Sequence, residues 1–170
     1  ELETAGRVDI TDVDQGEDGV RFDHRTLFDN GWRNRISFRE VSDNQYFEDL
    51  GGSLSSASIT HLDRSFSFDF QTDTLSFLGQ VQDFQTIDNQ IEAADEPYRR
   101  LPQVVFDANW PVGALRLGID SELVNFDRDT GVTGWRFNAA PKAELAFGKP
   151  GWFFNPAVAF DYTRYALSDT

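Results

Sequence analysis

The sequence predicts an all-β fold, an antiparallel up-and-down meander of about nine strands that forms part of a transmembrane β-barrel. Three observations lead to this prediction. Apolar and polar residues alternate with period two through most of the chain, which is typical of strands with one apolar and one polar face. The alternating segments that begin at Leu115 and Trp135 run for about 13 residues each, more than the roughly 5–6 of an average strand and enough for the roughly 9–11 tilted residues that cross a bilayer. No segment shows a helical period.

The composition excludes several classes of function. The formal net charge is −14, from 29 acidic and 15 basic residues, so a nucleic acid would be repelled and is not an expected partner. The chain has no cysteine, which leaves neither a disulfide framework nor a thiolate metal site. The chain contains no run of about 18 apolar residues, so the sequence predicts no transmembrane helix. Because the chain begins at Glu1 without methionine and ends just after a predicted strand, we expect a fragment of a longer protein.

The first half of the chain predicts five strands. A weak first strand ends at Ile10, and the acidic, glycine-containing segment 12–19 is predicted to be a loop. The next two strands, over 20–28 and 32–39, are joined by an Asn30-Gly31 pair, which supplies the positive φ of a tight hairpin. A longer loop is expected from 42 to 56.

Strands over 62–71 and 75–81 follow, with a short turn between them. Near Asp83 the alternation slips by one residue, which predicts a β-bulge.

The second half predicts four more strands. A polar connection that contains Pro97 leads to a strand over 102–110. The two long segments over 115–126 and 135–147 come next, and a final strand covers 154–162.

The predicted connections alternate between short and long. Those near residues 30, 73, 112 and 150 are short, whereas those over 12–19, 42–56, 88–101 and 127–132 are mostly longer and more acidic. Outer-membrane barrels show this asymmetry, with short periplasmic turns and longer external loops. Trp32, Trp110 and Trp152 all fall at the ends with short turns, where an amphipathic ring would lie at a membrane interface.

Several motifs in these connections resemble one known family. They are the segments 41–51 (VSDNQYFEDLG) and 98–103 (YRRLPQ), followed by Phe126-Asp127-Arg128 and by 131–134 (GVTG). In this order they resemble the barrel domain of the LPS-assembly protein LptD family, also called organic solvent tolerance proteins. The resemblance extends from about residue 19 to about residue 165. It implies that residues 1–170 are a partial outer-membrane β-barrel domain, without the family's N-terminal periplasmic domain, its cysteines and its remaining strands.

The resemblance also implies a function, partners and a location. Members of the family form, with an LptE lipoprotein plug inside the barrel, the translocon that inserts lipopolysaccharide into the outer leaflet of the bacterial outer membrane. Lipopolysaccharide, an LptE-like lipoprotein and outer-membrane lipid are therefore the expected partners. No cofactor is implied. Periodicity alone does not decide whether the phenylalanine ladder is a sandwich core or a lipid-facing surface, and the resemblance favours the lipid-facing surface.

Three sets of site residues follow from this interpretation. The polar positions of the strands are expected to face a hydrated lumen, and they are Arg33, Arg35, Arg39, Asp107, Arg116, Asp120, Glu122, Arg136, Lys142 and Glu144. The apolar positions are expected to face lipid, and they include Phe66, Phe68, Phe70, Phe106, Leu117, Ile119, Phe137 and Leu145. Basic residues of the external loops are expected to contact lipopolysaccharide phosphates, and they are Arg99, Arg100 and Arg128.

No catalytic or metal site is expected. His24 and His61 are the only histidines, they lie on different predicted strands, and no nucleophile motif accompanies either. The acidic residues of the segment 12–18 lack the spacing of an EF-hand, so solvation explains them better than Ca²⁺. The alternative function is a soluble all-β sandwich that binds carbohydrate, in which the same apolar face is buried between two sheets.

Overall fold

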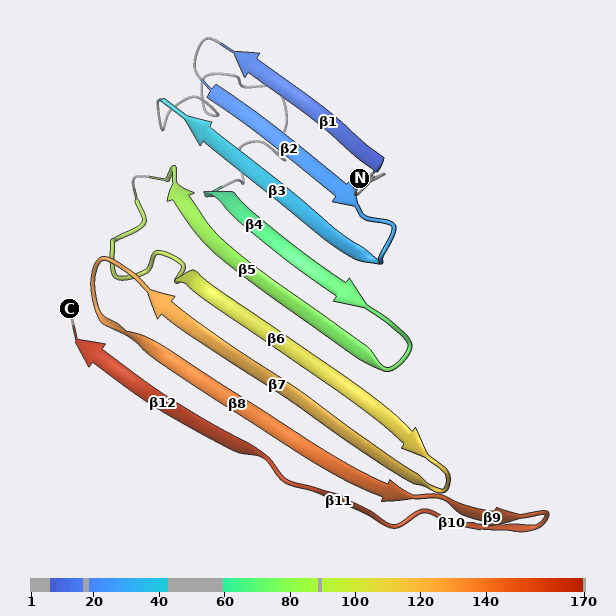
Figure 1. Ribbon diagram of the computed structural model, residues 1–170. Helices are drawn as coiled ribbons and strands as arrows, with labels where there is room; N and C mark the ends of the chain where they lie inside the picture. Colours follow the sequence, from blue (N-terminus) through green and yellow to red (C-terminus); the bar gives the residue numbers. More distant parts are fainter. Residues whose placement is uncertain (1–6, 17–18, 43–59, 89, 170) are drawn as a thin grey trace, which may run out of the picture.

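The computed structural model describes residues 7–16, 19–42, 60–88 and 90–169, and every regular element in these ranges is a β-strand (Figure 1). No helix in the described ranges has the length and apolar character needed to span a membrane. The strands are β1 (Arg7–Gly16), β2 (Gly19–Leu27), β3 (Trp32–Val41), β4 (His61–Gln71), β5 (Leu75–Thr86), β6 (Arg99–Val112), β7 (Leu115–Asp127), β8 (Val132–Leu145), β9 (Phe147–Lys149), β10 (Trp152–Phe154), β11 (Ala157–Ala159) and β12 (Tyr162–Asp169).

The strands form an antiparallel meander. From β1 to β8, each strand pairs with the next one along the chain. β8 then pairs with β11 over a short stretch and with β12 over most of its length, while β9 and β10 form a separate hairpin. β6 and β8 have 14 residues each and β7 has 13, which confirms the long strands that the alternation predicts. The predicted all-β, up-and-down fold is confirmed.

The first strand is longer than predicted. Residues 12–16, which the acidic composition assigned to a loop, belong to β1, and only residues 17 and 18 separate β1 from β2. The loop prediction for 12–16 is therefore wrong. The register gives part of the reason, since it pairs Asp9 with Arg25 and Asp14 with Arg21, whereas Asp12 lies at a register shift and has no partner. Opposed positions of opposite charge favour strand pairing, against the low strand propensity of aspartate.

The C-terminal strand is interrupted where one continuous strand over 154–162 was predicted. β10, β11 and β12 divide this region, and β12 continues to Asp169. Pro156, which cannot donate a ladder hydrogen bond, lies in the gap between β10 and β11. Gly151 takes a positive φ of 98° in the preceding turn. The β9–β10 hairpin extends beyond the neighbouring turn between β6 and β7 (Figure 1).

The lengths of the connections at the two ends of the sheet differ less than the sequence predicts. The turn end holds the connections 28–31, 72–74 and 113–114, and the loop end holds 17–18, 42–60, 87–98 and 128–131. Only two connections at the loop end are long, and the first of them lies almost entirely outside the described residues. The expected bulge near Asp83 is not found in β5, whose register with β4 is unbroken from Ser76 to Thr86; the register instead places an extra residue in β6, between Arg100 and Gln103.

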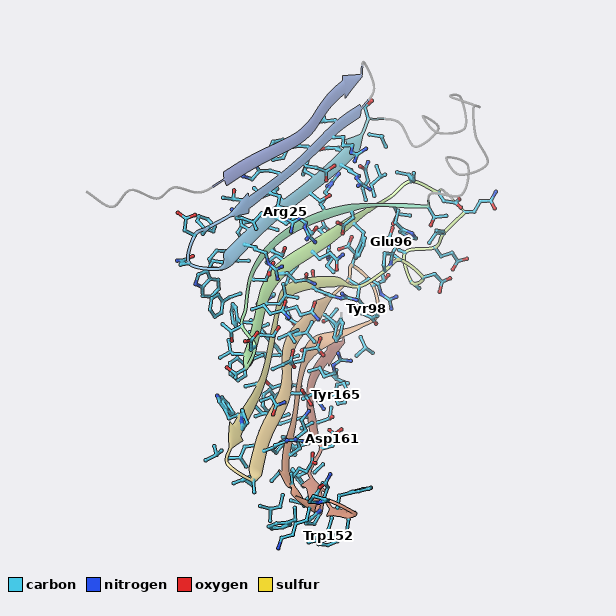
Figure 2. All side chains as sticks on the ribbon, turned by 90° about the vertical axis from the view of Figure 1, so that its right-hand side faces the viewer. Arg25, Glu96, Tyr98, Trp152, Asp161 and Tyr165 are labelled. Carbon is cyan, nitrogen blue, oxygen red and sulfur yellow. The ribbon has the colours of Figure 1, made fainter. Side chains whose placement is uncertain are left out.

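The registers separate the side chains onto two faces. We call the side that carries Phe66, Phe77, Phe106 and their register partners the apolar face, and the opposite side the polar face. Directly opposed residues of antiparallel strands share a face, and successive residues alternate between faces. Figure 2 shows that the sheet is strongly twisted, so that β1 to β3 and β6 to β8 run in different directions.

The sheet is a single layer with a very small core. Within the described residues, the buried apolar cluster consists of Val41, Leu62 and Ile87 at the loop end. Large apolar side chains of the apolar face remain exposed, among them Phe66 at 43% and Phe137 at 40%. No second sheet covers this face in the part of the chain that the structure describes. A sandwich core, which the alternative function requires, is therefore not formed by these strands.

Candidate functional site

The apolar face gathers all eight residues that were predicted to contact lipid. The register aligns Phe68 and Phe70 of β4 with β5, Phe77 of β5 with Phe106 of β6, and Leu123 of β7 with Phe137 of β8. Phe66, Leu117, Ile119 and Leu145 occupy the same face by alternation. The structure thus brings this set together on one side of one sheet. Contact with lipid stays a prediction.

An aromatic cluster marks the turn end of this face. The ring of Trp32 stacks on Phe68 at a centroid distance of 4.5 Å and on Phe70 at 4.9 Å, and it meets the edge of Phe77 at 5.8 Å. Trp110 lies near the end of β6 at the same edge of the sheet, and Trp152 lies in the β9–β10 hairpin (Figure 2). Three strands therefore contribute to one cluster at the level where the sequence predicts an interfacial belt.

The polar face gathers all ten residues that were predicted to face a lumen. Several of them form ion pairs between neighbouring strands. Arg33 of β3 lies 2.5 Å from Asp69 of β4, and Lys142 of β8 lies 3.0 Å from Asp120 of β7. A longer pair, at 3.5 Å, joins Arg116 and Glu144, which are directly opposed in the register. Most of these groups are partly exposed, so each pair contributes little to stability by itself.

A continuous chain of hydrogen bonds crosses the polar face from β5 to β8. The amide of Gln80 donates to Gln103 at 2.5 Å, the amide of Gln103 donates to Glu122 at 2.5 Å, and the guanidinium of Arg136 donates to the other oxygen of Glu122. Beneath this chain Val124, the register partner of Gln103 and Arg136, is fully buried. Sequence reasoning identified Glu122 and Arg136 but missed both glutamines, because a neutral glutamine carries no charge pattern.

Two of the predicted external arginines already have protein partners. Arg99 lies 2.7 Å from Asp127 and 2.6 Å from Asp129. Arg128 donates to the carbonyl oxygens of Ala94 and Glu96, and its guanidinium lies 4.2 Å above the ring of Tyr98. These two arginines therefore hold the loop between β5 and β6 against the β7–β8 turn. The contact of these two arginines and of Arg100 with lipopolysaccharide stays a prediction.

Tyr98 and Gly134 have structural roles, and sequence reasoning did not single out Tyr98. The hydroxyl of Tyr98 donates to the carbonyl of Val132 at 2.9 Å and accepts a bond from Arg128 at 3.0 Å. Gly134 has a φ of 137°, and a Cβ at this position would lie 2.2 Å from the carbonyl oxygen of Ala166 in β12. Gly134 therefore marks a close approach of β8 and β12.

The histidines have local partners. His24 Nε2 lies 2.8 Å from the hydroxyl of Thr26, and His61 Nδ1 lies 2.8 Å from that of Thr60. Among the described residues, no group of three or more histidine and acidic side chains could hold a metal ion. The candidate site thus consists of the two opposite faces of the sheet, the apolar face and the charged polar face.

Known proteins share this sequence over most of its length. A family model for LPS transport system D, LptD, matches residues 17–170. An LPS-assembly protein LptD from Nitrosococcus oceani is 42% identical over 142 residues, which are 81% of this chain and 19% of that protein. Its counterpart from Marinobacter nauticus is 32% identical over 169 residues, which are 93% of this chain and 21% of that protein. The chain thus spans about a fifth of the length of these curated relatives. Through this match over nearly its whole length, the chain belongs to the LptD family of LPS transport proteins.

Proposed function

We propose that this chain forms part of the wall of an outer-membrane β-barrel that inserts lipopolysaccharide into the outer leaflet. Its apolar face contacts membrane lipid, and its polar face lines a hydrated lumen. The observation that carries this proposal is the complete separation of the predicted lipid-facing and lumen-facing residues onto opposite faces of a single sheet that no other described element covers. A barrel wall needs this arrangement, because lipid solvates one surface and water the other.

The family supports the assignment to lipopolysaccharide transport, since the relatives are named LPS-assembly proteins. In this proposal the saccharide part of lipopolysaccharide and an LptE-like lipoprotein meet the polar face, where charged and amide side chains offer both donors and acceptors. In this proposal the protein acts without catalysis, and Asp69, Asp120 and Glu122 of the polar face form ion pairs with basic side chains of neighbouring strands.

Photo-crosslinking in cells tests the proposal directly. A benzophenone amino acid is placed in the complete gene product at Leu117, on the apolar face, or at Asn138, on the polar face. We expect the label at Asn138 to capture lipopolysaccharide or a lipoprotein, and the label at Leu117 to capture phospholipid or the lipid part of lipopolysaccharide but no lipoprotein. Capture of soluble proteins by both labels would contradict a membrane-embedded wall.

A further inference from the structure

The apolar stretch of the apolar face is shortest in β4 and longest in β8. Counting alternate positions on this face, it covers residues 66–70 in β4, 75–81 in β5, 104–112 in β6, 115–123 in β7 and 135–145 in β8. Only Gly79 and Ser121 interrupt these stretches. The number of apolar positions therefore doubles from β4 to β8, although all these strands belong to one sheet.

A row of charged residues limits the apolar stretch toward the loop end. Arg64 of β4 is directly opposed to Asp83 of β5, on the same face as Phe66 and Val81. Glu40 of β3 belongs to this row, and its carboxylate lies 3.8 Å from the guanidinium of Arg64. Arg64 also donates to Gln85 at 3.0 Å and to the carbonyl of Arg39 at 3.2 Å. These contacts fix the charged groups close to the apolar stretch.

Strand geometry converts these positions into heights. A strand rises about 3.3 Å per residue and is tilted by roughly 40° in a barrel, so each residue adds about 2.5 Å along the membrane normal. Arg64 is six residues from Phe70, the residue of the β4 apolar stretch nearest the turn end, so Arg64 lies about 15 Å above Phe70 along the membrane normal. In β8, ten residues separate Leu145 from Trp135, which gives an apolar height of about 25 Å. The height at β8 matches the usual band of an outer-membrane barrel, and the height at β4 is much smaller.

The narrowing continues into β2 and β3. Asn34 lies between Trp32 and Ile36 on the apolar face, and its side-chain oxygen accepts a hydrogen bond from the backbone N–H of Thr26 at 3.0 Å. The ring of His24 lies on the same face and is hydrogen-bonded to the Thr26 hydroxyl. Polar side chains therefore also interrupt the apolar face in β2 and β3, next to the short stretch of β4. Beside the long stretch of β8, Arg164 of β12, the register partner of Phe137, lies on the same face near the loop-end limit of that stretch.

We propose that the membrane in contact with β3 to β5 is locally thinner than the membrane in contact with β8, so that headgroups and water reach Arg64 and Asp83. This inference rests on the proposed function, because it requires the apolar face to lie in lipid. In a bilayer of uniform thickness, the cluster of Arg64, Glu40 and Asp83 would lie within hydrocarbon, where lipid cannot hydrate it. Deformation of the bilayer costs only a fraction of a kcal/mol per ångström and removes that penalty.

Spin labels at matched heights test the inference. Position 64 is six residues from Phe70 in β4, and position 139 is six residues from Leu145 in β8. A second matched pair is 83, eight residues from Leu75, and 137, eight residues from Leu145. Each position carries the only free cysteine of the complete gene product, which is labelled with a nitroxide and reconstituted in phosphatidylcholine vesicles. The measurement is the ratio of collision rates with oxygen, which concentrates in hydrocarbon, and with a water-soluble nickel chelate.

We expect oxygen to dominate at 137 and 139 and the nickel chelate to dominate at 64 and 83. If oxygen dominates at all four positions, the membrane is uniform and the inference is wrong, while the proposed function stands. If the nickel chelate dominates at all four, the apolar face does not lie in lipid and the proposed function itself is wrong. The second pair keeps the test decisive if a variant at position 64 does not fold.

Discussion

At the scale of single residues, neighbouring positions of one strand should respond in opposite ways to the same substitution. Phe137 and Asn138 are adjacent in β8 and lie on the apolar and polar faces, respectively. We expect Phe137→Arg to destabilise the complete gene product by about 2–4 kcal/mol if the residue lies near the bilayer midplane, because lipid cannot hydrate a guanidinium. Asn138→Arg faces Glu122 across the strand pair and should cost much less. Unfolding in phospholipid vesicles measures both; equal costs would indicate a sheet that is buried on both faces.

Gly134 should be far more sensitive than an ordinary strand glycine. Its φ of 137° is rare for residues with a side chain, and an added Cβ would meet the backbone of β12 at 2.2 Å. We expect Gly134→Ala to cost at least about 1–3 kcal/mol through backbone strain and to weaken the pairing of β8 with β12. Faster hydrogen exchange in β12 would show this effect.

Gly79 provides the matched control for that substitution. It also lies inside a strand, but an added Cβ would have its nearest contact at an ordinary 3.6 Å. Gly79→Ala should therefore leave hydrogen exchange in β12 unchanged. A similar loss of protection in both variants would mean that glycine content, rather than the close approach of β12, determines the stability of this region.

At the scale of elements, Arg128 should determine the order of the β5–β6 connection. It joins the carbonyls of Ala94 and Glu96 to the ring of Tyr98, so one side chain of the β7–β8 turn holds three points of that connection. Hydrogen bonds to charged groups contribute about 1.5–3 kcal/mol. We expect Arg128→Ala to accelerate proteolysis within residues 87–98 several-fold in intact cells, and Arg100→Ala to leave it unchanged. Equal cleavage in the two variants would contradict the prediction that Arg128 orders the β5–β6 connection.

The elements also show what the sequence could and could not predict. Period-two alternation located β2 to β8, because each of these strands has one apolar and one polar face, although β5 continues to Thr86, beyond the predicted strand over 75–81. It failed at β1, where Asp12 and Asp14 lie in a strand and the register pairs Asp14 with Arg21 of β2. Such pairing joins residues of different strands, and no local pattern contains it. The division of the last strand into β10, β11 and β12 was missed for a related reason, since Pro156 breaks a segment whose apolar alternation is otherwise continuous.

The two faces of the sheet were predicted better than the connections. The residues predicted to face a lumen share the polar face and those predicted to face lipid share the apolar face, because side-chain alternation follows directly from strand geometry. Their contacts with lumen and lipid stay predictions. The glutamines of the hydrogen-bond chain and the bonds of Arg128 were not predicted. They depend on which strands are neighbours and on how loops fold back, and the sequence pattern specifies neither.

At the scale of the whole molecule, the sheet has two edges that the described residues leave unpaired. β1 pairs only with β2, and β12 pairs only with β8. Each outer edge presents a row of backbone N–H and C=O groups that can template another strand. In a closed barrel, further strands would cover these groups, and in lipid or detergent every such group must be satisfied.

We therefore expect the isolated 170-residue chain to associate through these edges even in excess detergent. Detergent covers the apolar face, but it cannot form a ladder of hydrogen bonds with an exposed strand. Size-exclusion chromatography with light scattering should show dimers or larger assemblies, whose mass does not fall as the detergent concentration is raised. Association driven by the apolar face alone would disappear under the same titration, because detergent competes for that surface. A stable monomer at all detergent concentrations would contradict the prediction, and it would mean that the twist of the sheet or residues outside the described ranges protect both edges.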